Sequence, residues 1–328
     1  MKKALKIFLL LCYILICGEV IIRVSSSFIS IYDVEMLKYA VKLKRRSENP
    51  KLTHKHIPNS SVKLMGVNVS LNSLGQRSPE LAIPKPADEK RIYVLGSSIA
   101  LGWGVPVEQT FPCLVEEKLN ARKISPNNGY YRVINAGMGN TNTFAQVELF
   151  KAQVDKTEPD FAILQFFIND AELQQKRSDY WFLKNSYFLA YVYQSAKVLS
   201  FRFYGPPSLG DYYASFYNGT HAGWNEAKAS LGELKAICNE RSIPLFVLLV
   251  PDLHNLSAES VFPGLYNQIM LTFQQIEIPA VSAYPDVARK FAGNERASWV
   301  ARDDAHPNAE VHRIMAGNLY DLLVQEGL

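Results

Sequence analysis

The chain has 328 residues, of which 48% are hydrophobic and 20% charged, a composition ordinary for a globular protein. This length is enough for one α/β domain with a real core and a shorter accessory segment. The net charge of +4 is too small and too dispersed to indicate a nucleic-acid partner, so we exclude that class. Two of the four cysteines lie in the first apolar stretch, so no disulfide framework is expected.

The N-terminal sequence indicates a membrane segment. Lysines precede an apolar run from Ile7 to Gly18, which resumes after Glu19 and stops at Arg23. The uninterrupted part has the length of a signal-peptide core, but no small-residue cleavage pattern follows it. We therefore predict that residues 1–26 form an uncleaved single-pass anchor, with the rest of the chain outside the cytoplasm, as in a periplasmic protein. A cleaved signal peptide is the alternative, and a buried soluble helix is the third reading.

Residues 27–88 are expected to form a small membrane-proximal segment. Apolar spacing predicts an amphipathic helix over residues 27–50, which ends in a basic cluster that we expect to be solvated. His54 and His56 lie in a polar stretch, so we expect exposed side chains and assign no metal. Residues 67–71 alternate like a half-buried strand, and a proline-rich stretch over 83–88 marks a boundary.

The remaining residues, 89–328, alternate strands with helices. We predict strands at 92–95, 131–135, 161–167, 243–250 and 278–281, and helices at 108–120, 144–154, 224–240 and 311–323. This order indicates a parallel sheet covered by helices on both faces. In such sheets the ligand lies across the carboxyl ends of the strands. Ser98, Gly139, Asn140 and Asn169 each follow the end of a strand, so we expect them to converge there.

The residue types at this edge suit acyl transfer. Ser98 sits one residue beyond the turn at Gly96, where an exposed hydroxyl can act as a nucleophile once a base removes its proton. His306 is the candidate base, and it needs a carboxylate on its other ring nitrogen. We favour Asp303, three residues earlier, over Asp304, because we expect the Asp304 side chain to point away.

Attack on an ester also requires donors for the oxyanion that forms. The candidates are the backbone N–H of Ser98, the backbone N–H of Gly139 or of Asn140, and the side-chain amide of Asn169. Each of these residues alone has a purely structural explanation, as a cap, a turn or a tight loop. Together, in this order and at these strand ends, they indicate a serine hydrolase site that needs no cofactor.

The same residues resemble the SGNH hydrolases, the Gly-Asp-Ser-Leu esterase superfamily. Four blocks match in order over residues 91–320: Gly96-Ser97-Ser98, the glycine block from Asn135, Phe167-Ile-Asn169-Asp170, and Asp303 to His306. The resemblance implies a flavodoxin-like three-layer α/β/α sandwich, with Ser98 as nucleophile, Asn169 as oxyanion donor and Asp303 with His306 as its charge partners.

Three positions depart from the pattern of that family. Ser97 replaces the aspartate of the first block, which removes a carboxylate beside the nucleophile. Phe167 replaces the glycine before Asn-Asp, which suggests a tighter or more apolar acyl pocket. The oxyanion glycine of the family aligns best with Asn140, with Gly139 just before it.

The elbow-like run Gly96 to Ala100 also resembles the nucleophile turn of α/β-hydrolases. Those folds place several strands before the serine, and their acid and histidine lie on separate loops. Here the serine follows the first strand of the domain, and one loop carries both acid and base, so we reject that reading.

Residues 174–222 interrupt the alternation with many aromatic side chains, among them Tyr180. We expect mainly core packing, with a lid beside the site or an interfacial location as alternatives. The leading functional hypothesis is a membrane-tethered serine esterase that removes acetyl or other acyl groups from a carbohydrate or lipid. The alternatives are an O-acyltransferase that uses the same triad and a non-catalytic glycan-binding or assembly protein. Protein partners are not indicated.

Overall fold

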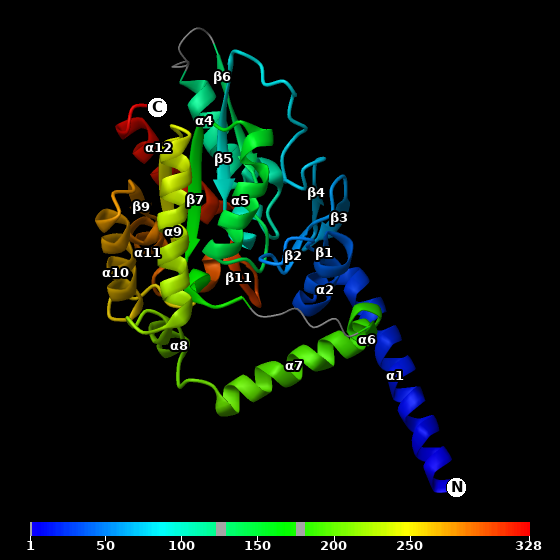
Figure 1. Cartoon of the computed structure of the whole chain (residues 1–328). Coiled ribbons are helices and arrows are strands. Elements are labelled where there is room, and N and C mark those ends of the chain that lie inside the picture. The colour runs from blue at the N-terminus through cyan, green and yellow to red at the C-terminus, as the bar shows by residue number, and fades with distance from the viewer. Residues whose placement is uncertain (1, 123–128, 175–180) are drawn as a thin grey trace.

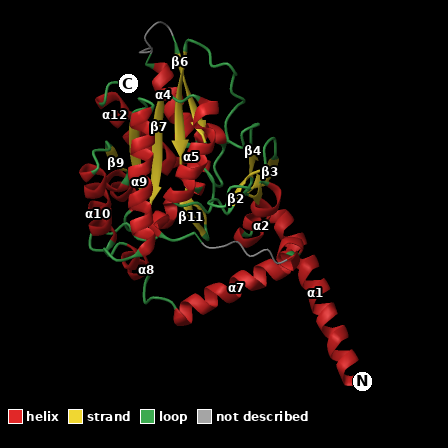
Figure 2. Ribbon diagram, in the orientation of Figure 1, coloured by secondary structure: helices red, strands yellow, loops and turns green. Residues whose placement is uncertain are grey.

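The computed structural model describes residues 2–122, 129–174 and 181–328. Its centre is a parallel five-stranded sheet with the strand order β6-β5-β7-β8-β9 (Figure 2). The strands are β5 (Glu89–Leu95), β6 (Tyr130–Asn135), β7 (Phe161–Phe167), β8 (Leu245–Val250) and β9 (Ala280–Ser282). The carboxyl ends of β5, β6 and β7 therefore lie side by side, and the catalytic serine predicted from the sequence follows β5.

Helices cover both faces of this sheet (Figure 1). One face carries α5 (Thr143–Thr157), α9 (Ala222–Glu240) and α10 (Phe262–Gln275), and the other carries α4 (Phe111–Ala121), α11 (Tyr284–Phe291) and α12 (Ala309–Gln325). Successive side chains of a strand point to opposite faces. Accordingly, Tyr93 and Leu95 enter the first core, whereas Ile92 and Val94 enter the second. The predicted three-layer α/β/α architecture is confirmed.

Shorter elements complete the domain. The helix α3 (Ser98–Leu101) follows β5 directly, and the hairpin of β10 (Trp299–Ala301) and β11 (Asp304–Pro307) precedes α12. Within the described parts of the chain, the 3-10 helices are η1 (Val107–Gln109), η3 (Ile168–Ala171) and η4 (Glu295–Ser298).

The expected aromatic insertion contains α6 (Trp181–Asn185), α7 (Tyr187–Tyr204) and α8 (Leu209–Phe216). Residues 175–180, with Tyr180, lie outside the described residues. Phe216 and Tyr217 are buried in the core, as expected, but most of α7 is exposed.

The membrane-proximal segment is more structured than expected. Its helix α2 spans only Tyr32–Lys42, and two small antiparallel ladders follow: β1 (Lys44–Arg46) with β2 (His54–His56), and β3 (Ser61–Leu64) with β4 (Val67–Ser70). The predicted strand near residues 67–71 is present as β4.

One expectation for the membrane-proximal segment is wrong, and a second holds except at one residue. His54 and His56 are buried, with 5% and 7% of their surface exposed, because β1 and β2 fold back against the α/β domain. In the basic cluster Lys42, Arg45 and Arg46 are exposed, as expected, whereas Lys44 is buried, at 6% exposure. The segment has its own apolar cluster, and Leu101 and Trp103 of the α/β domain belong to it together with Tyr39, Leu43 and Leu64.

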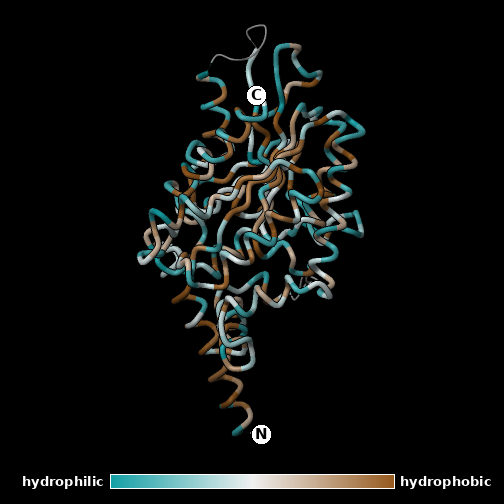
Figure 3. Tube along the Cα trace, turned by 90° about the vertical axis from the view of Figure 1, so that its left-hand side faces the viewer, coloured by the Kyte–Doolittle hydropathy of each residue, from teal (hydrophilic) through white to brown (hydrophobic). Residues whose placement is uncertain are grey.

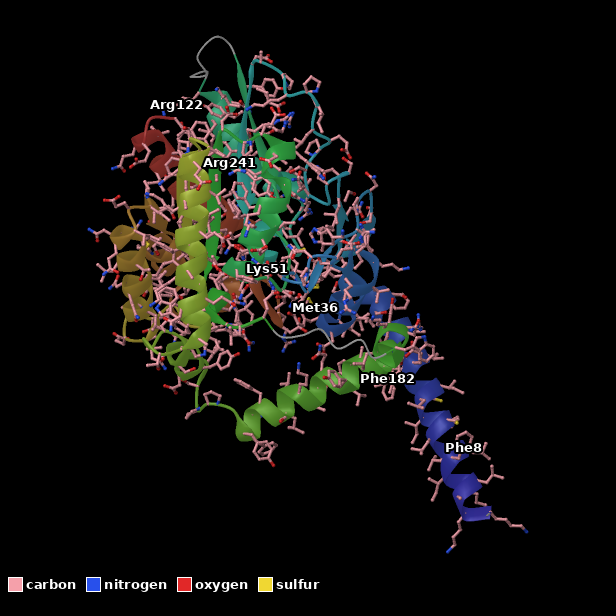
Figure 4. The ribbon with its side chains drawn as sticks, in the orientation of Figure 1. Phe8, Met36, Lys51, Arg122, Phe182 and Arg241 are labelled. Atoms are coloured by element: carbon pink, nitrogen blue, oxygen red, sulfur yellow. The ribbon has the colours of Figure 1, made fainter. Side chains whose placement is uncertain are left out.

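The N-terminal helix α1 (Lys2–Phe28) projects from the sandwich and buries none of its residues (Figure 3). It is the one helix among the described residues that is long and apolar enough to cross a membrane, a test that a signal sequence passes equally. Figure 4 shows Phe8 far out on this projecting helix, whereas Phe182 lies near the point where α6 meets it.

Candidate active site

Ser98 is placed by the turn between β5 and α3. It is the first residue of α3, and the Ser97 hydroxyl caps that helix by accepting a hydrogen bond from the N–H of Ile99 at 3.3 Å. A Cβ atom at Gly96 would lie 2.5 Å from the Ala100 side chain, so only glycine fits this turn. Ser98 is therefore held, partly exposed, at the carboxyl edge of the sheet.

Ser98 faces His306 across the sheet edge. The Ser98 Oγ atom lies 2.8 Å from His306 Nε2, a distance at which the imidazole can accept the hydroxyl proton. The second ring nitrogen, Nδ1, lies 2.6 Å from Oδ1 of Asp304. The backbone N–H of His306 donates to the same carboxylate oxygen at 3.1 Å, which fixes the ring beside it.

The carboxylate at His306 is thus that of Asp304, and the expectation that Asp303 would occupy this position is wrong. The reason is that residues 304–307 form a strand, in which side chains two positions apart share a face. Asp303 lies in the turn of the hairpin and is exposed, whereas Asp304 is 3% exposed.

Trp103 completes the surroundings of the acid, a role for this residue that was not predicted from the sequence. Its indole Nε1–H donates to Asp304 Oδ2 at 2.7 Å, so both carboxylate oxygens are hydrogen-bonded. Burial raises the pKa of the Asp304 carboxyl, but the hydrogen bonds from His306 and Trp103 hold it below its usual range. Asp304 therefore stays ionised while buried. The signal in the sequence is the tryptophan between two glycines directly after the nucleophile helix.

The loop after β6 supplies backbone donors. The Gly139 N–H donates to the Tyr39 hydroxyl at 2.8 Å, so this donor is engaged. The Asn140 N–H has no acceptor among the described residues. The geometry therefore favours Asn140, of the two residues left open by the sequence, as a candidate oxyanion donor. The N–H of Ser98, at the first position of α3, is the second candidate.

The peptide between Gly139 and Asn140 is held by residues from outside the sandwich. Lys44 Nζ donates to the Gly139 carbonyl oxygen at 2.6 Å, and His54 Nε2 lies 3.0 Å from the same oxygen. Asn140 has a φ of 60°, the left-handed region that asparagine tolerates better than most residues. Because a trans peptide directs its C=O and N–H oppositely, the Asn140 N–H points away from Lys44 and His54.

Asn169 lies on η3, directly after β7, as expected for the third donor. The following residue, Asp170, is fully buried and accepts hydrogen bonds from the Phe167 N–H at 2.6 Å and from Gln146 Nε2 at 3.1 Å. Burial raises the pKa of the Asp170 carboxyl to about 8, against the opposite effect of these hydrogen bonds. These contacts tie the turn to α5 and so position Asn169.

Ser97, the residue before Ser98, contacts a neutral side chain of the neighbouring strand. Oε1 of Gln165, on β7, accepts hydrogen bonds from both the N–H and the hydroxyl of Ser97 at 3.1 Å. Ser97 is buried, so its side chain serves the turn and does not face a ligand.

A cavity of about 470 Å³ reaches Asn140 and Asn169. It lies between the sheet edge, α2 and α7, and most of the side chains around it are polar. They include Lys44 and His54 from the membrane-proximal segment and Tyr193, Gln194 and Lys197 from α7. Among the described residues, no group of three or more His, Cys, Asp or Glu side chains is arranged to hold a metal ion.

A second Asp-x-His pair lies beyond β8. The Asp252 Oδ1 atom accepts from the His254 N–H at 2.8 Å and lies 3.0 Å from its Nδ1, as in the pair on β11. The hydrogen bond to Asp252 raises the pKa of His254, although burial opposes this effect. This histidine packs against Trp299 and has no contact with Ser98, so it is a natural control for His306.

Neither the models of protein families nor the curated proteins include a match to this sequence. The chain is similar to a solved two-domain esterase active on acetylated mannans, with 18% identity and a TM-score of 0.44 over 72% of this chain and 49% of that chain. It therefore spans about half the length of that esterase.

Two further solved structures match a similar share of the chain. An acetylxylan esterase from Geobacillus stearothermophilus has 16% identity and a TM-score of 0.43, over 71% of this chain and 94% of that one. A G-D-S-L family protein from Desulfitobacterium hafniense has 10% identity and a TM-score of 0.43, over 71% and 99%.

Proposed function

We propose that this chain is a serine esterase of the SGNH type, which hydrolyses an O-acyl ester through Ser98, His306 and Asp304. The observation that carries the proposal is the unbroken hydrogen-bonded series from Ser98 Oγ to His306 and from His306 to the buried Asp304 carboxylate. This arrangement matches the requirements of nucleophilic acyl transfer: a nucleophile, a base and a group that orients the base.

In the first half of the reaction, Ser98 Oγ attacks the ester carbonyl carbon and His306 Nε2 takes the hydroxyl proton. Asp304 stabilises the imidazolium that forms, and it keeps the Nδ1 proton in place. The negative charge on the carbonyl oxygen is received by the N–H groups of Ser98 and Asn140 and by the Asn169 amide. The imidazolium then protonates the leaving alkoxide, which departs as an alcohol and leaves Ser98 acylated.

In the second half, His306 deprotonates a water molecule, which attacks the acyl-enzyme carbonyl. The same donors stabilise the second oxyanion, and collapse of this intermediate returns the proton to Ser98 and releases a carboxylic acid. A lost oxyanion donor commonly lowers kcat by about 10²–10³-fold, so three donors account for a large part of the catalysis.

The cavity indicates the class of leaving group. The cavity is lined by hydrogen-bond donors and acceptors, which are amide and hydroxyl side chains together with Lys44 and His54. Tyr193 adds an aromatic ring to the lining. A carbohydrate presents hydroxyls at its edge and C–H groups on its ring faces, so it suits this lining. We therefore propose an O-acylated carbohydrate as the substrate, with a small acyl group such as acetyl at Ser98.

The proposal is tested by labelling the full-length protein with a fluorophosphonate and by following hydrolysis of p-nitrophenyl acetate. Ser98→Ala is expected to abolish both signals. His306→Gln is expected to lower the rate of hydrolysis by at least about 10³-fold. His254→Gln, the matched control substitution in the other Asp-x-His pair, should leave that rate near the wild-type value. A wild-type protein that is folded but neither labelled nor active on the ester would overturn the proposal.

A further inference from the structure

The helix α7 has two different faces. Ala190, Tyr193, Gln194 and Lys197 lie around the cavity, at the spacing that places them on one side of a helix. Val192, Leu199 and Phe203 lie on the opposite side, and they are 44%, 55% and 71% exposed. An apolar stripe with this much exposure on an 18-residue helix requires a partner.

The beginning of α7 is attached to α1. The Glu19 carboxylate of α1 accepts hydrogen bonds from the Ser186 hydroxyl at 2.7 Å and from the N–H groups of Tyr187 and Phe188 at 3.2 and 2.9 Å. A carboxylate at this position satisfies the unpaired donors of a helix start. Gly18 lies directly against the Phe188 ring, since a Cβ there would come within 2.7 Å of it.

Glu19 is also the residue at which the long apolar run of α1 is interrupted. The start of α7 is therefore attached where α1 would leave a bilayer. From there α7 runs across the underside of the sandwich, at a large angle to α1 (Figure 1). A helix in this position lies along the membrane surface if α1 spans the membrane.

The charges of α7 fit the same surface. Its 18 residues include Lys197 and Arg202 and no acidic residue. Arg202 follows Leu199 by three residues and so lies next to the apolar stripe, whereas Lys197 is on the cavity face. A long basic side chain in the position of Arg202 extends to lipid phosphates while the stripe enters the acyl region, the pattern of helices that lie in a membrane interface.

We propose that α7 lies in the outer interface of the bilayer, with Val192, Leu199 and Phe203 in the lipid, and that the ester is carried by a membrane-embedded amphiphile. The second part rests on the proposed esterase function. This second part follows from the position of α7, which forms one wall of the cavity. With its outer face in the lipid, α7 separates the cavity from the bilayer. The acylated head group of a lipid-linked carbohydrate therefore passes over α7 to reach Asn140 and Asn169.

The position of α7 is tested with two matched tryptophan substitutions, Leu199→Trp on the outer face and Gln194→Trp on the cavity face. The full-length protein is reconstituted in vesicles of phosphatidylcholine and phosphatidylglycerol, with and without brominated acyl chains. Bromolipid is expected to quench the fluorescence added by Leu199→Trp and to leave that added by Gln194→Trp unchanged. Equal quenching at both positions, or none at either, would show that α7 does not lie in the interface.

The substrate class is tested with the variant Leu199→Glu/Phe203→Glu, compared with the wild type in the same vesicles. We expect unchanged hydrolysis of soluble p-nitrophenyl acetate and a loss of at least about tenfold on an O-acetylated long-chain alkyl glucoside embedded in the bilayer. Equal activity of the two proteins on the embedded ester would overturn the proposed route. Inactivity of the wild type on both esters would overturn the esterase function instead, while the quenching result would stand by itself.

Discussion

Asp304 and His306 stand two residues apart on β11, and Oδ1 of the first lies 2.6 Å from Nδ1 of the second. Both side chains point to one face of the strand, and Asp303, in the turn, points into solvent. The identity of the acid therefore depends on strand geometry, and two adjacent aspartates provide a matched pair of variants.

Asp304→Asn is expected to lower kcat for p-nitrophenyl acetate by about 10²–10⁴-fold. The reason is that an amide neither stabilises the imidazolium nor holds the neutral His306 ring in the tautomer with its proton on Nδ1. Asp303→Asn should remain within about twofold of the wild type, since that side chain is exposed and has no contact with His306. Steady-state kinetics on both purified variants decide the assignment. A larger loss in Asp303→Asn than in Asp304→Asn would reverse it.

Trp103 is expected to act as a positioning residue for the acid. Trp103→Phe removes the donor to Asp304 Oδ2 and leaves a buried carboxylate oxygen unpaired, which costs about 1–3 kcal/mol in the free energy of unfolding. We expect kcat to fall about tenfold with little change in KM, because the Asp304 carboxylate is then held less firmly in the orientation that stabilises the imidazolium. Trp299→Phe, which removes a donor to the Leu253 carbonyl, is the control and should leave kcat near the wild-type value.

The stability of the protein is expected to depend on Asp304 in acid. The pKa of this carboxyl is lowered in the folded state, whereas in the unfolded chain it is about 3.9. The stabilisation from the ionised group is thus fully present above the unfolded pKa and is lost as the pH falls through the folded pKa. Thermal unfolding of detergent-solubilised protein below pH ~4 should show a steeper loss of stability in the wild type than in Asp304→Asn. Parallel curves for the two proteins would contradict this expectation.

Lys44 and His54 are expected to influence the reaction through the peptide that they hold. Lys44→Met removes a charged donor from the Gly139 carbonyl, so the Asn140 N–H is less polarised and less well oriented. We expect kcat to fall about tenfold with KM nearly unchanged, with partial recovery in Lys44→Arg and a smaller loss in His54→Gln. Lys42→Met, at an exposed lysine two residues earlier, is the control. A fall confined to KM, or equal losses at both lysines, would exclude this role.

Much of the sheet was predictable because its strands are buried on both faces and therefore appear as short apolar runs. The same argument placed Ser98 and Asn169 at strand ends, since a parallel sheet gathers those ends at one edge. The acid could not be assigned correctly from the sequence, because residues 304–307, Asp-Ala-His-Pro, form a run of only four residues that ends in a proline and does not indicate a strand. A loop with a three-residue spacing was expected where a strand with a two-residue period exists.

The contacts made by the membrane-proximal segment could not be predicted in the same way. Tyr39, Lys44 and His54 contact a loop about a hundred residues further along the chain, and no local pattern specifies such pairings. His54 was expected to be exposed because its neighbours are polar. Its burial results from the β1–β2 ladder, whose strands have only three residues each and show little apolar character.

The apolar cluster shared by Trp103 and the membrane-proximal segment has a consequence for the autonomy of the sandwich. A chain shortened to residues 89–328 would retain every strand of the sheet, together with Ser98, Asp304 and His306. It would lose Tyr39, Leu43 and Leu64, which cover Trp103, and water would reach the indole that holds the acid. If the proposed esterase function holds, we expect the minimal active unit to begin no later than the start of α2, well before the first strand of the sandwich.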